Sequence, residues 1–328
     1  FFTGHHDTWY YGVMDNGGAN ATMLEVSRLA AERRDLWRRG LRVVFWSGHS
    51  QGRYSSSAWY ADHHWEELRA RALVHVNVDS TGGKGNTDVD RTTAAAELRP
   101  LAAEAIREQA GQSFGNRRMG RAGDQSFWGI GVPAIFANMS TQPAAPDKPV
   151  AGPPSMFRQG KQGGFGTGWW WHTPDDLLDK IDPDILVRDT RIYMHAVWRL
   201  LADPVLPFDW AEHGRTLLAE LDALARACPR FDLSGLRDRA TRLVALAEAL
   251  PQGDPARLNA AHQRVAHALV PVDYTACDPF DHDPATPMGP YPALQPLRDL
   301  GQLAEGSDAA RFLETRLVRA RTRVAVAL

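Results

Sequence analysis

Apolar residues recur at the spacing of an amphipathic helix in several long segments of this chain. The first such segment runs from residue 20 to about 39, and Gly40 is a natural stop after it. The same spacing predicts a helix that begins in residues 59–72 and further helices at 94–110 and 182–202. The pattern therefore indicates a chain that is rich in helices, each with one face to bury.

Short apolar runs lie between these helices and predict strands. They are L-R-V-V-F-W-S at 41–47, A-L-V-H-V-N-V-D at 72–79 and V-P-A-I-F-A-N at 132–138. The opening F-F-T-G-H-H-D is typical of the end of a buried strand that runs into a loop, so we expect the chain to begin inside a longer protein. Strands that alternate with helices predict an α/β fold with a mostly parallel, helix-covered sheet.

The pattern changes near residue 205. With 328 residues the chain is long enough for about two domains. We predict an α/β domain over residues 1–205 and a helical bundle over 206–328, where Leu, Ala and Arg dominate. An irregular, Pro-rich tongue at 270–292 interrupts the bundle, and the stretch at about 140–168 is predicted to be a long loop.

Composition and charge narrow the range of partners. A net charge of -2 and a pI of about 6.7 argue against nucleic acid and against an anionic membrane surface. No apolar run approaches the roughly 20 residues that span a bilayer, and the first residues lack the pattern of a signal peptide. We therefore expect a soluble chain with a small molecule or peptide as its partner, in a compartment that the sequence does not define. Cys228 and Cys277 exclude a disulfide framework, although one bridge between them is open.

Side chains that bind metals follow the predicted strands. His5, Asp7 and Asp15 lie near the start, Asp79 ends a strand, and His172 follows three tryptophans. Open α/β sheets bind ligands at such strand ends. Imidazoles and carboxylates without thiolates suit zinc at a catalytic site. Each residue alone also has an ordinary explanation, such as a loop histidine, a turn aspartate or a helix cap, so the indication comes from the set.

Several motifs in this order resemble metallopeptidase family 28, the co-catalytic zinc exopeptidases. They are G-H-H-D-T-W, M-D-N-G-G, V-D-S-T-G-G, the Gly-Asp and G-I-G-V-P-A segment, and W-H-T-P-D-D. The resemblance covers residues 1 to about 205. Beyond it, L-P-F-D-W and the helices are similar to the dimerisation domain of the glutamate carboxypeptidase and transferrin receptor branch. The resemblance implies a zinc exopeptidase fold, one or two zinc ions and a homodimer formed by the helical domain.

Carried over by position, the resemblance assigns a role to each candidate. His5 and Asp79 would bind one metal, Asp15 would bridge two, His172 would bind the second, and Asp7 would orient His5. In the family, the strand after the first helix ends in two glutamates, a general base and a ligand of the second metal. This chain has His49 and Ser50 there.

Three hypotheses account for this departure. His49 could replace the base, since imidazole titrates near neutral pH. It could instead become a metal ligand, with the base supplied by another group, and a related alternative brings His63 or His64 into the site. In the third hypothesis the second metal is lost, and the domain is a non-catalytic binding or scaffold protein.

We predict a metal-dependent hydrolase in which activated water cleaves an amide of a small peptide or N-acyl amino acid, with His49 as the base. Substrate contacts are predicted for a basic cluster, an acid and an aromatic wall, namely Arg117, Arg118, Arg121, Asp124 and Trp171. The arginines could hold a substrate carboxylate or form a solvated loop face. Asp124 could receive a substrate amine.

Overall fold

A computed structural model describes residues 1–121, 123–143, 166–250, 253–286 and 288–328. Most of the long loop predicted at 140–168 lies outside these residues. The described residues form one six-stranded sheet in the order β2-β1-β3-β6-β4-β5. Its strands are β1 (Phe2–His5), β2 (Val43–Trp46), β3 (His75–Asn77), β4 (Thr93–Ala94), β5 (Arg117–Arg118) and β6 (Ala134–Ile135). Four neighbouring pairs are parallel and β4 with β6 is antiparallel, so the predicted, mostly parallel α/β sheet is confirmed.

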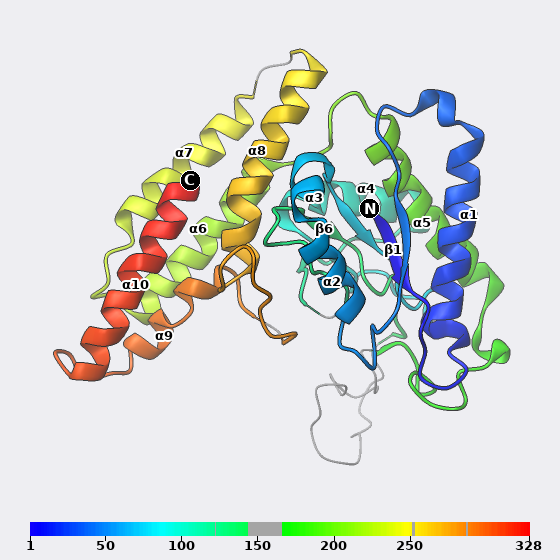
Figure 1. Ribbon diagram of the computed structural model, residues 1–328, viewed down its shortest axis with the longest axis horizontal. Coiled ribbons are helices and arrows are strands. Elements are labelled where there is room, and N and C mark those ends of the chain that lie inside the picture. Colours follow the sequence, from blue (N-terminus) through cyan, green and yellow to red (C-terminus); the bar gives the residue numbers. More distant parts are fainter. Residues whose placement is uncertain (122, 144–165, 251–252, 287) are drawn as a thin grey trace.

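Helices cover both faces of the sheet (Figure 1). On one face, α5 packs against α1 and α4, and on the other α2 and α3 cover a smaller core around Trp46 and Phe127. The helices of this part are α1 (Ala19–Glu32), α2 (Ser55–His63), α3 (Trp65–Arg71), α4 (Arg99–Ala110) and α5 (Pro183–Ala202), with short turns η1 (Val13–Gly18), η2 (Arg34–Leu36), η3 (Ala96–Leu98) and η5 (Leu178–Lys180).

Two predicted helices differ in extent from those observed. The first ends at Glu32 instead of near residue 39, because the chain leaves the helical conformation at Arg33 and turns back. The Trp37 indole then donates to the Ala30 carbonyl, 3.0 Å away, so an apolar residue that fits the helical spacing packs from outside the helix. The helix predicted within 59–72 is two helices, which meet at His64.

The remainder of the chain is helical, with α6 (Trp210–Ala227), α7 (Ser234–Glu248), α8 (Pro255–Tyr274), η6 (Pro292–Leu294), α9 (Leu297–Leu300) and α10 (Asp308–Ala327). Figure 1 shows α8 as the helix of this bundle that faces the sheet. Trp210 and Tyr274 belong to the same apolar core as the sheet, so the two parts share a packed interface. The predicted boundary near residue 205 and the pairing of two chains through these helices stay predictions.

The irregular tongue begins after Tyr274, a few residues later than predicted, because α8 continues through Pro271. Cys228 and Cys277 are both free thiols. Among the described residues, no helix is both long and apolar enough to cross a membrane.

Candidate metal centre

Three neighbouring parallel strands bring the predicted ligands together. In the sheet, β1 lies between β2 and β3, and all three run in the same direction. His5 is the last residue of β1, His49 lies in the loop after β2, and Asp79 lies two residues beyond β3. Because parallel strands end at the same edge of a sheet, these side chains converge there, as the sequence predicted for an α/β ligand site.

Asp15 lies between two imidazoles. Its Oδ1 atom is 3.1 Å from His5 Nε2, and its Oδ2 atom is 2.8 Å from His172 Nε2. The carboxylate is 3% exposed, so it faces these rings and not solvent. One carboxylate oxygen toward each histidine is compatible with the bridging role that the family resemblance implies for Asp15.

Asp176, which was not predicted from the sequence, fixes the position of Asp15. Its carboxylate accepts hydrogen bonds from the backbone N–H groups of Met14, at 2.8 Å, and Asp15, at 3.0 Å. This acid follows His172 in W-H-T-P-D-D, so the loop that carries one histidine also holds the chain around Asp15. The two adjacent acids in that motif were the available signal, but the sequence does not show which one is buried.

Asn16 is a second residue that the sequence analysis did not assign. Its amide nitrogen donates to the carbonyls of His5 and Val78, and its carbonyl accepts from the Ser80 N–H. The side chain therefore joins the ends of β1 and β3. A Cβ at Gly4 would approach the Val78 carbonyl to 2.8 Å, so this close approach requires glycine before His5.

His5 is oriented by Asp7, through the main chain. The His5 Nδ1–H donates to the Asp7 carbonyl at 2.7 Å, whereas the Asp7 carboxylate is 3.8 Å away. That carboxylate accepts from the backbone N–H groups of His49 and Ser50. Asp7 thus contacts His5 through its carbonyl, and its carboxylate holds the loop that carries residues 49 and 50.

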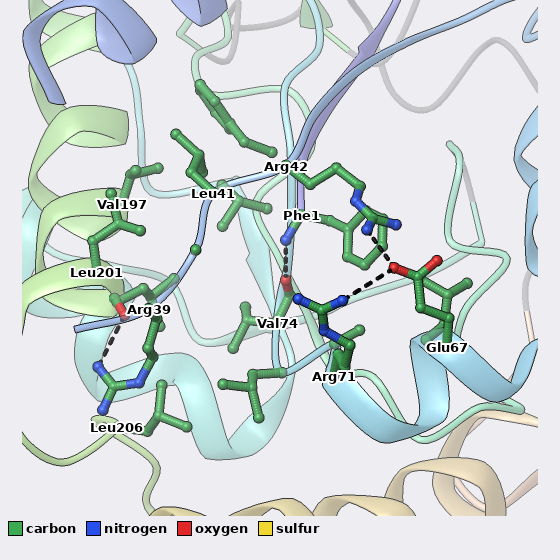
Figure 2. Close-up of a pocket in the computed structure, with 17 residues that line it drawn as sticks. Phe1, Arg39, Leu41, Arg42, Glu67, Arg71, Val74, Val197, Leu201 and Leu206 are labelled. Atoms are coloured by element: carbon green, nitrogen blue, oxygen red, sulfur yellow. Dashed lines mark hydrogen bonds and ion pairs between the residues drawn. The ribbon is translucent and has the colours of Figure 1, made fainter. Parts of the chain in front are cut away.

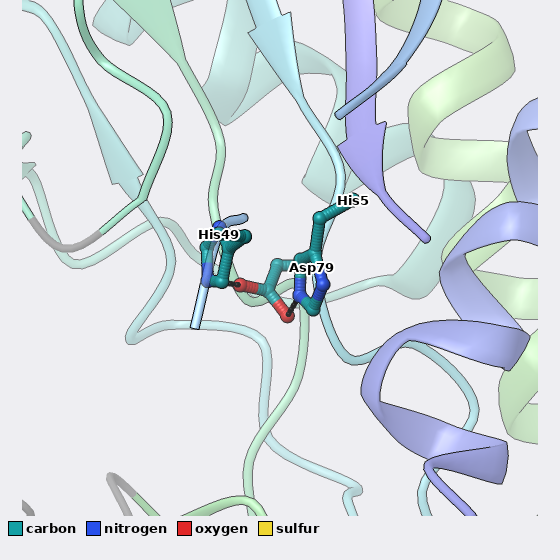
Figure 3. Close-up of side chains that lie close together, drawn as sticks. All are labelled: His5, His49 and Asp79. Carbon is teal, nitrogen blue, oxygen red and sulfur yellow. Dashed lines mark ion pairs between the residues drawn. The ribbon is translucent and has the colours of Figure 1, made fainter. Parts of the chain in front are cut away.

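His49 joins the cluster at the side of Asp79 (Figure 3). Its ring stacks on the His5 ring at 3.7 Å between centroids and 7° between planes. The Nε2 atom is 4.0 Å from Asp79 Oδ2, while Nδ1 is 2.7 Å from Asp124 Oδ2. The sequence suggested Asp124 as a partner for a substrate amine; the structure buries it at 1% exposure against His49 instead.

The electrostatics of the cluster favour a positive charge. Burial lowers the pKa of His5, but hydrogen bonding and charge from Asp15 and Asp79 outweigh it and raise that pKa to about 11. Burial likewise raises the pKa of Asp15, and the two histidines outweigh it and hold the pKa below its usual range. Asp15 and Asp79 therefore stabilise a positive charge at this position, and protonation of His5 provides such a charge.

The polar atoms at the centre fit a metal ion. Among the described residues, the buried atoms His5 Nε2 and Asp15 Oδ1 lie 3.1 Å apart and have no hydrogen-bond partner outside the cluster. One ligand atom each from His5, His49 and Asp79 lie within 4.8 Å of one another. Two imidazoles and a carboxylate suit zinc, whose bonds to such ligands are about 2.0–2.2 Å long.

Of the residues predicted to contact substrate, Trp171 lies at the site, whereas the three arginines contact other parts of the protein. Trp171 stacks on the His172 ring at 3.4 Å and belongs to the wall of the site. Arg118 does not join the site, because both carboxylate oxygens of Asp273 accept from its guanidinium at 2.9 Å. Arg117 donates to the Arg91 carbonyl and Arg121 to the Asp283 carbonyl of the tongue.

The remaining candidates lie outside the cluster. The His63 ring contacts the Trp59 carbonyl on the exposed surface of α2, and the His64 ring packs at a tilt against the Tyr60 ring. A cavity of about 260 Å³ opens at the opposite edge of the sheet, beside Phe1, Arg42 and Val74 (Figure 2). These residues precede β1, β2 and β3, so the cavity is separate from the site at the carboxyl ends of the same strands.

Fold and site together describe a helix-covered α/β sheet with a candidate metal centre at its carboxyl edge. Residues 1–197 match peptidase family M28, and the chain belongs to this family.

Two curated relatives and one solved structure illustrate the similarity. A probable glutamate carboxypeptidase of Zea mays is 26% identical over 67% of this chain and 31% of its own length. A glutamate carboxypeptidase 2 homologue of Caenorhabditis briggsae is 27% identical over 38% of this chain and 16% of its own. The zinc aminopeptidase BSAP of Bacillus subtilis superposes with a TM-score of 0.48 at 19% identity, over 62% of this chain and 46% of that one. The chain spans about a third or less of the length of the curated relatives.

Proposed function

We propose that this chain carries the hydrolytic centre of a metal-dependent exopeptidase that acts on a small peptide or an N-acyl amino acid. The observation that carries the proposal is Asp15, a buried carboxylate whose two oxygens each face the Nε2 atom of one histidine. Membership of peptidase family M28 supports the same class of reaction. Zinc, when bound, would supply a Lewis acid that polarises the amide carbonyl and promotes ionisation of water.

The residues of the chain have separate tasks in this proposal. His5, Asp15, Asp79 and His172, with His49 beside them, are the candidates for metal ligands. Asp7 and Asp176 hold the backbone from which those ligands project, through bonds to residues 49–50 and 14–15. Trp9 and Trp171 contact the His172 ring and form an apolar wall beside it. Such a wall would exclude water around a bound side chain and favour an apolar residue next to the cleaved bond.

Turnover of defined substrates tests this proposal. The protein, loaded with zinc and dialysed, is incubated with a panel of dipeptides, aminoacyl anilides and N-acyl amino acids, and free amine is measured. We expect turnover that is lost with a chelator, restored by zinc and absent in His5→Ala. A folded, zinc-loaded protein that releases no amine from the whole panel would instead support the non-catalytic scaffold.

A further inference from the structure

We propose that this centre holds a single metal ion, bound by His5, His49 and Asp79, and that Asp124 is the positioning residue for His49. The inference deepens the proposed function by giving its metal site. It rests on the proposed function only for the kind of ion, because metal binding can be measured without turnover.

The three proposed ligand atoms converge on one point. His5 Nε2 is 3.8 Å from Asp79 Oδ1, and His49 Nε2 is 4.0 Å from Asp79 Oδ2. Ligand atoms about 2.1 Å from a tetrahedral ion lie roughly 3.5 Å apart, so small side-chain movements complete the site. Within the described part of the chain, His5, His49 and Asp79 form the group whose ligand atoms lie close enough together to hold one ion. His172 does not belong to this group. Three protein ligands leave the fourth position open, as in catalytic zinc sites.

Asp124 prepares His49 to be a ligand. Its carboxylate accepts the Nδ1–H of His49 at 2.7 Å, which leaves the lone pair of Nε2 directed at Asp79 and His5. A carboxylate that holds the distal nitrogen of a metal-bound imidazole is the usual support for such ligands. Asp124 is 1% exposed and belongs to the loop before β6, so it supports the ring from within the protein.

The surroundings of His49 favour a ligand over a general base. Its ring lies between His5, at 3.7 Å, and the edge of Tyr54, at 5.0 Å. Only 9% of the residue is exposed, and its remaining nitrogen points to the other ligands. A general base must lie within hydrogen-bond reach of the water molecule that attacks the substrate. The observed ring instead fills a place within the ligand cluster.

Metal stoichiometry and affinity test the inference. Zinc per chain is measured after equilibrium dialysis, and the dissociation constant is obtained by competition with a chromogenic chelator. We expect one ion per chain in the parent protein. His49→Ala should weaken binding at least about 100-fold, and Asp124→Asn by about 10- to 100-fold, the range for loss of a residue that supports a metal ligand. His63→Ala removes an exposed histidine of α2 and should leave affinity unchanged.

Cobalt supplies a spectroscopic measurement that a merely structural effect would not change. With one Co²⁺ bound, the visible absorption reports the ligand set, so it should shift in His49→Gln and Asp124→Asn and keep its shape in His63→Ala. Thermal unfolding of each metal-free variant shows whether that variant folds. If His49→Ala does not fold, His49→Gln, which retains a polar side chain, takes its place in the measurements.

The outcomes separate this inference from the proposed function. Two ions per chain, or normal affinity and spectrum in a folded His49 variant, would overturn the inference; if that variant also loses turnover, His49 is the base predicted from sequence. One ion with the expected losses but no turnover of any substrate would support this inference and contradict the proposed function alone.

Discussion

Residue 50 shows the chemical difference between this site and the two-metal exopeptidases that the sequence resembles. The family resemblance requires a carboxylate there, whereas this chain has Ser50, whose backbone N–H is bound by Asp7. On the other side of the site, Asp15 Oδ2 already contacts His172. A carboxylate at position 50 would add the ligand that a second ion lacks.

We therefore predict that Ser50→Glu raises the metal content from one to two zinc ions per chain. The family resemblance implies that a carboxylate at this position binds the second metal together with His172 and Asp15, and such oxygens bind zinc. Elemental analysis after dialysis measures the ratio. Ser50→Gln has the same size without the charge and should remain at one, and an equal ratio in both variants would contradict the prediction.

Asp176 gives a second prediction for a single residue. Asp176→Ala leaves the buried N–H groups of Met14 and Asp15 without their acceptor. Each unsatisfied buried donor costs about 1–3 kcal/mol, so we expect a loss of roughly 2–4 kcal/mol in the free energy of unfolding.

Urea denaturation measures the loss, and zinc affinity should fall as well because Asp15, which lies 3.1 Å from the ligand atom of His5, is no longer fixed. Asp175→Ala, at the exposed neighbouring acid, is the matched control and should change neither quantity. Equal stability of the two variants would show that Asp176 does not hold this loop.

At the scale of elements, the apolar patterns predicted the helices and strands that carry the site, but not the contacts between distant segments. The runs before residues 47 and 79 became β2 and β3, and the opening residues became β1. The two-residue strands β4 and β5 are too short to give a pattern and were missed.

Two charged residues show why the candidate site was only partly predictable. The partner of Arg118 is Asp273, 155 positions away, so a local cluster of arginines resembled a substrate site. Asp124 likewise meets His49 across 75 positions. Tertiary packing of a helix and of loops against the sheet brings such pairs together, and spacing along the chain does not reveal them.

Asn16 permits a test of how two strands are joined at the site. Asn16→Ala removes the bonds to His5 and Val78 on β1 and beyond β3, and the bond to Ser80. Loss of one typical net hydrogen bond costs about 1 kcal/mol and an unpaired buried group more, so we expect about 2–4 kcal/mol of destabilisation. Urea denaturation measures it. Asn20→Ala in α1 is the control, and a similar loss there would mean that the effect is not specific to the strand connection.

Across the whole molecule, a buried polar network connects the helical region to the α/β part. His213 of α6 contacts Glu97 of η3 through Nδ1 at 2.9 Å and the Tyr291 hydroxyl through Nε2 at 3.0 Å. Both His213 and Glu97 are at most 1% exposed. The Arg118–Asp273 pair also joins the two parts, between β5 and α8. Their relative position therefore depends on buried charge pairs as well as on the shared apolar core.

This network predicts how stability changes with pH. Burial lowers the pKa of His213, but the hydrogen bond and charge of Glu97 outweigh it and raise the pKa. A group whose folded pKa is raised contributes its full stability below the unfolded value, about 6.5 for histidine. The contribution declines as pH rises through the folded pKa. The parent protein should thus lose this part of its unfolding free energy from near pH 6.5 upward.

Urea denaturation of the parent protein and His213→Gln at pH 6 and pH 9 tests the sign. The stability difference between them should be larger at pH 6, because the histidine is then charged beside Glu97 in the folded protein. The exposed substitution His63→Gln should follow the parent at both values. A difference that is constant with pH, or larger at pH 9, would mean that His213 stays neutral against Glu97 and that the two parts are joined by packing and neutral hydrogen bonds.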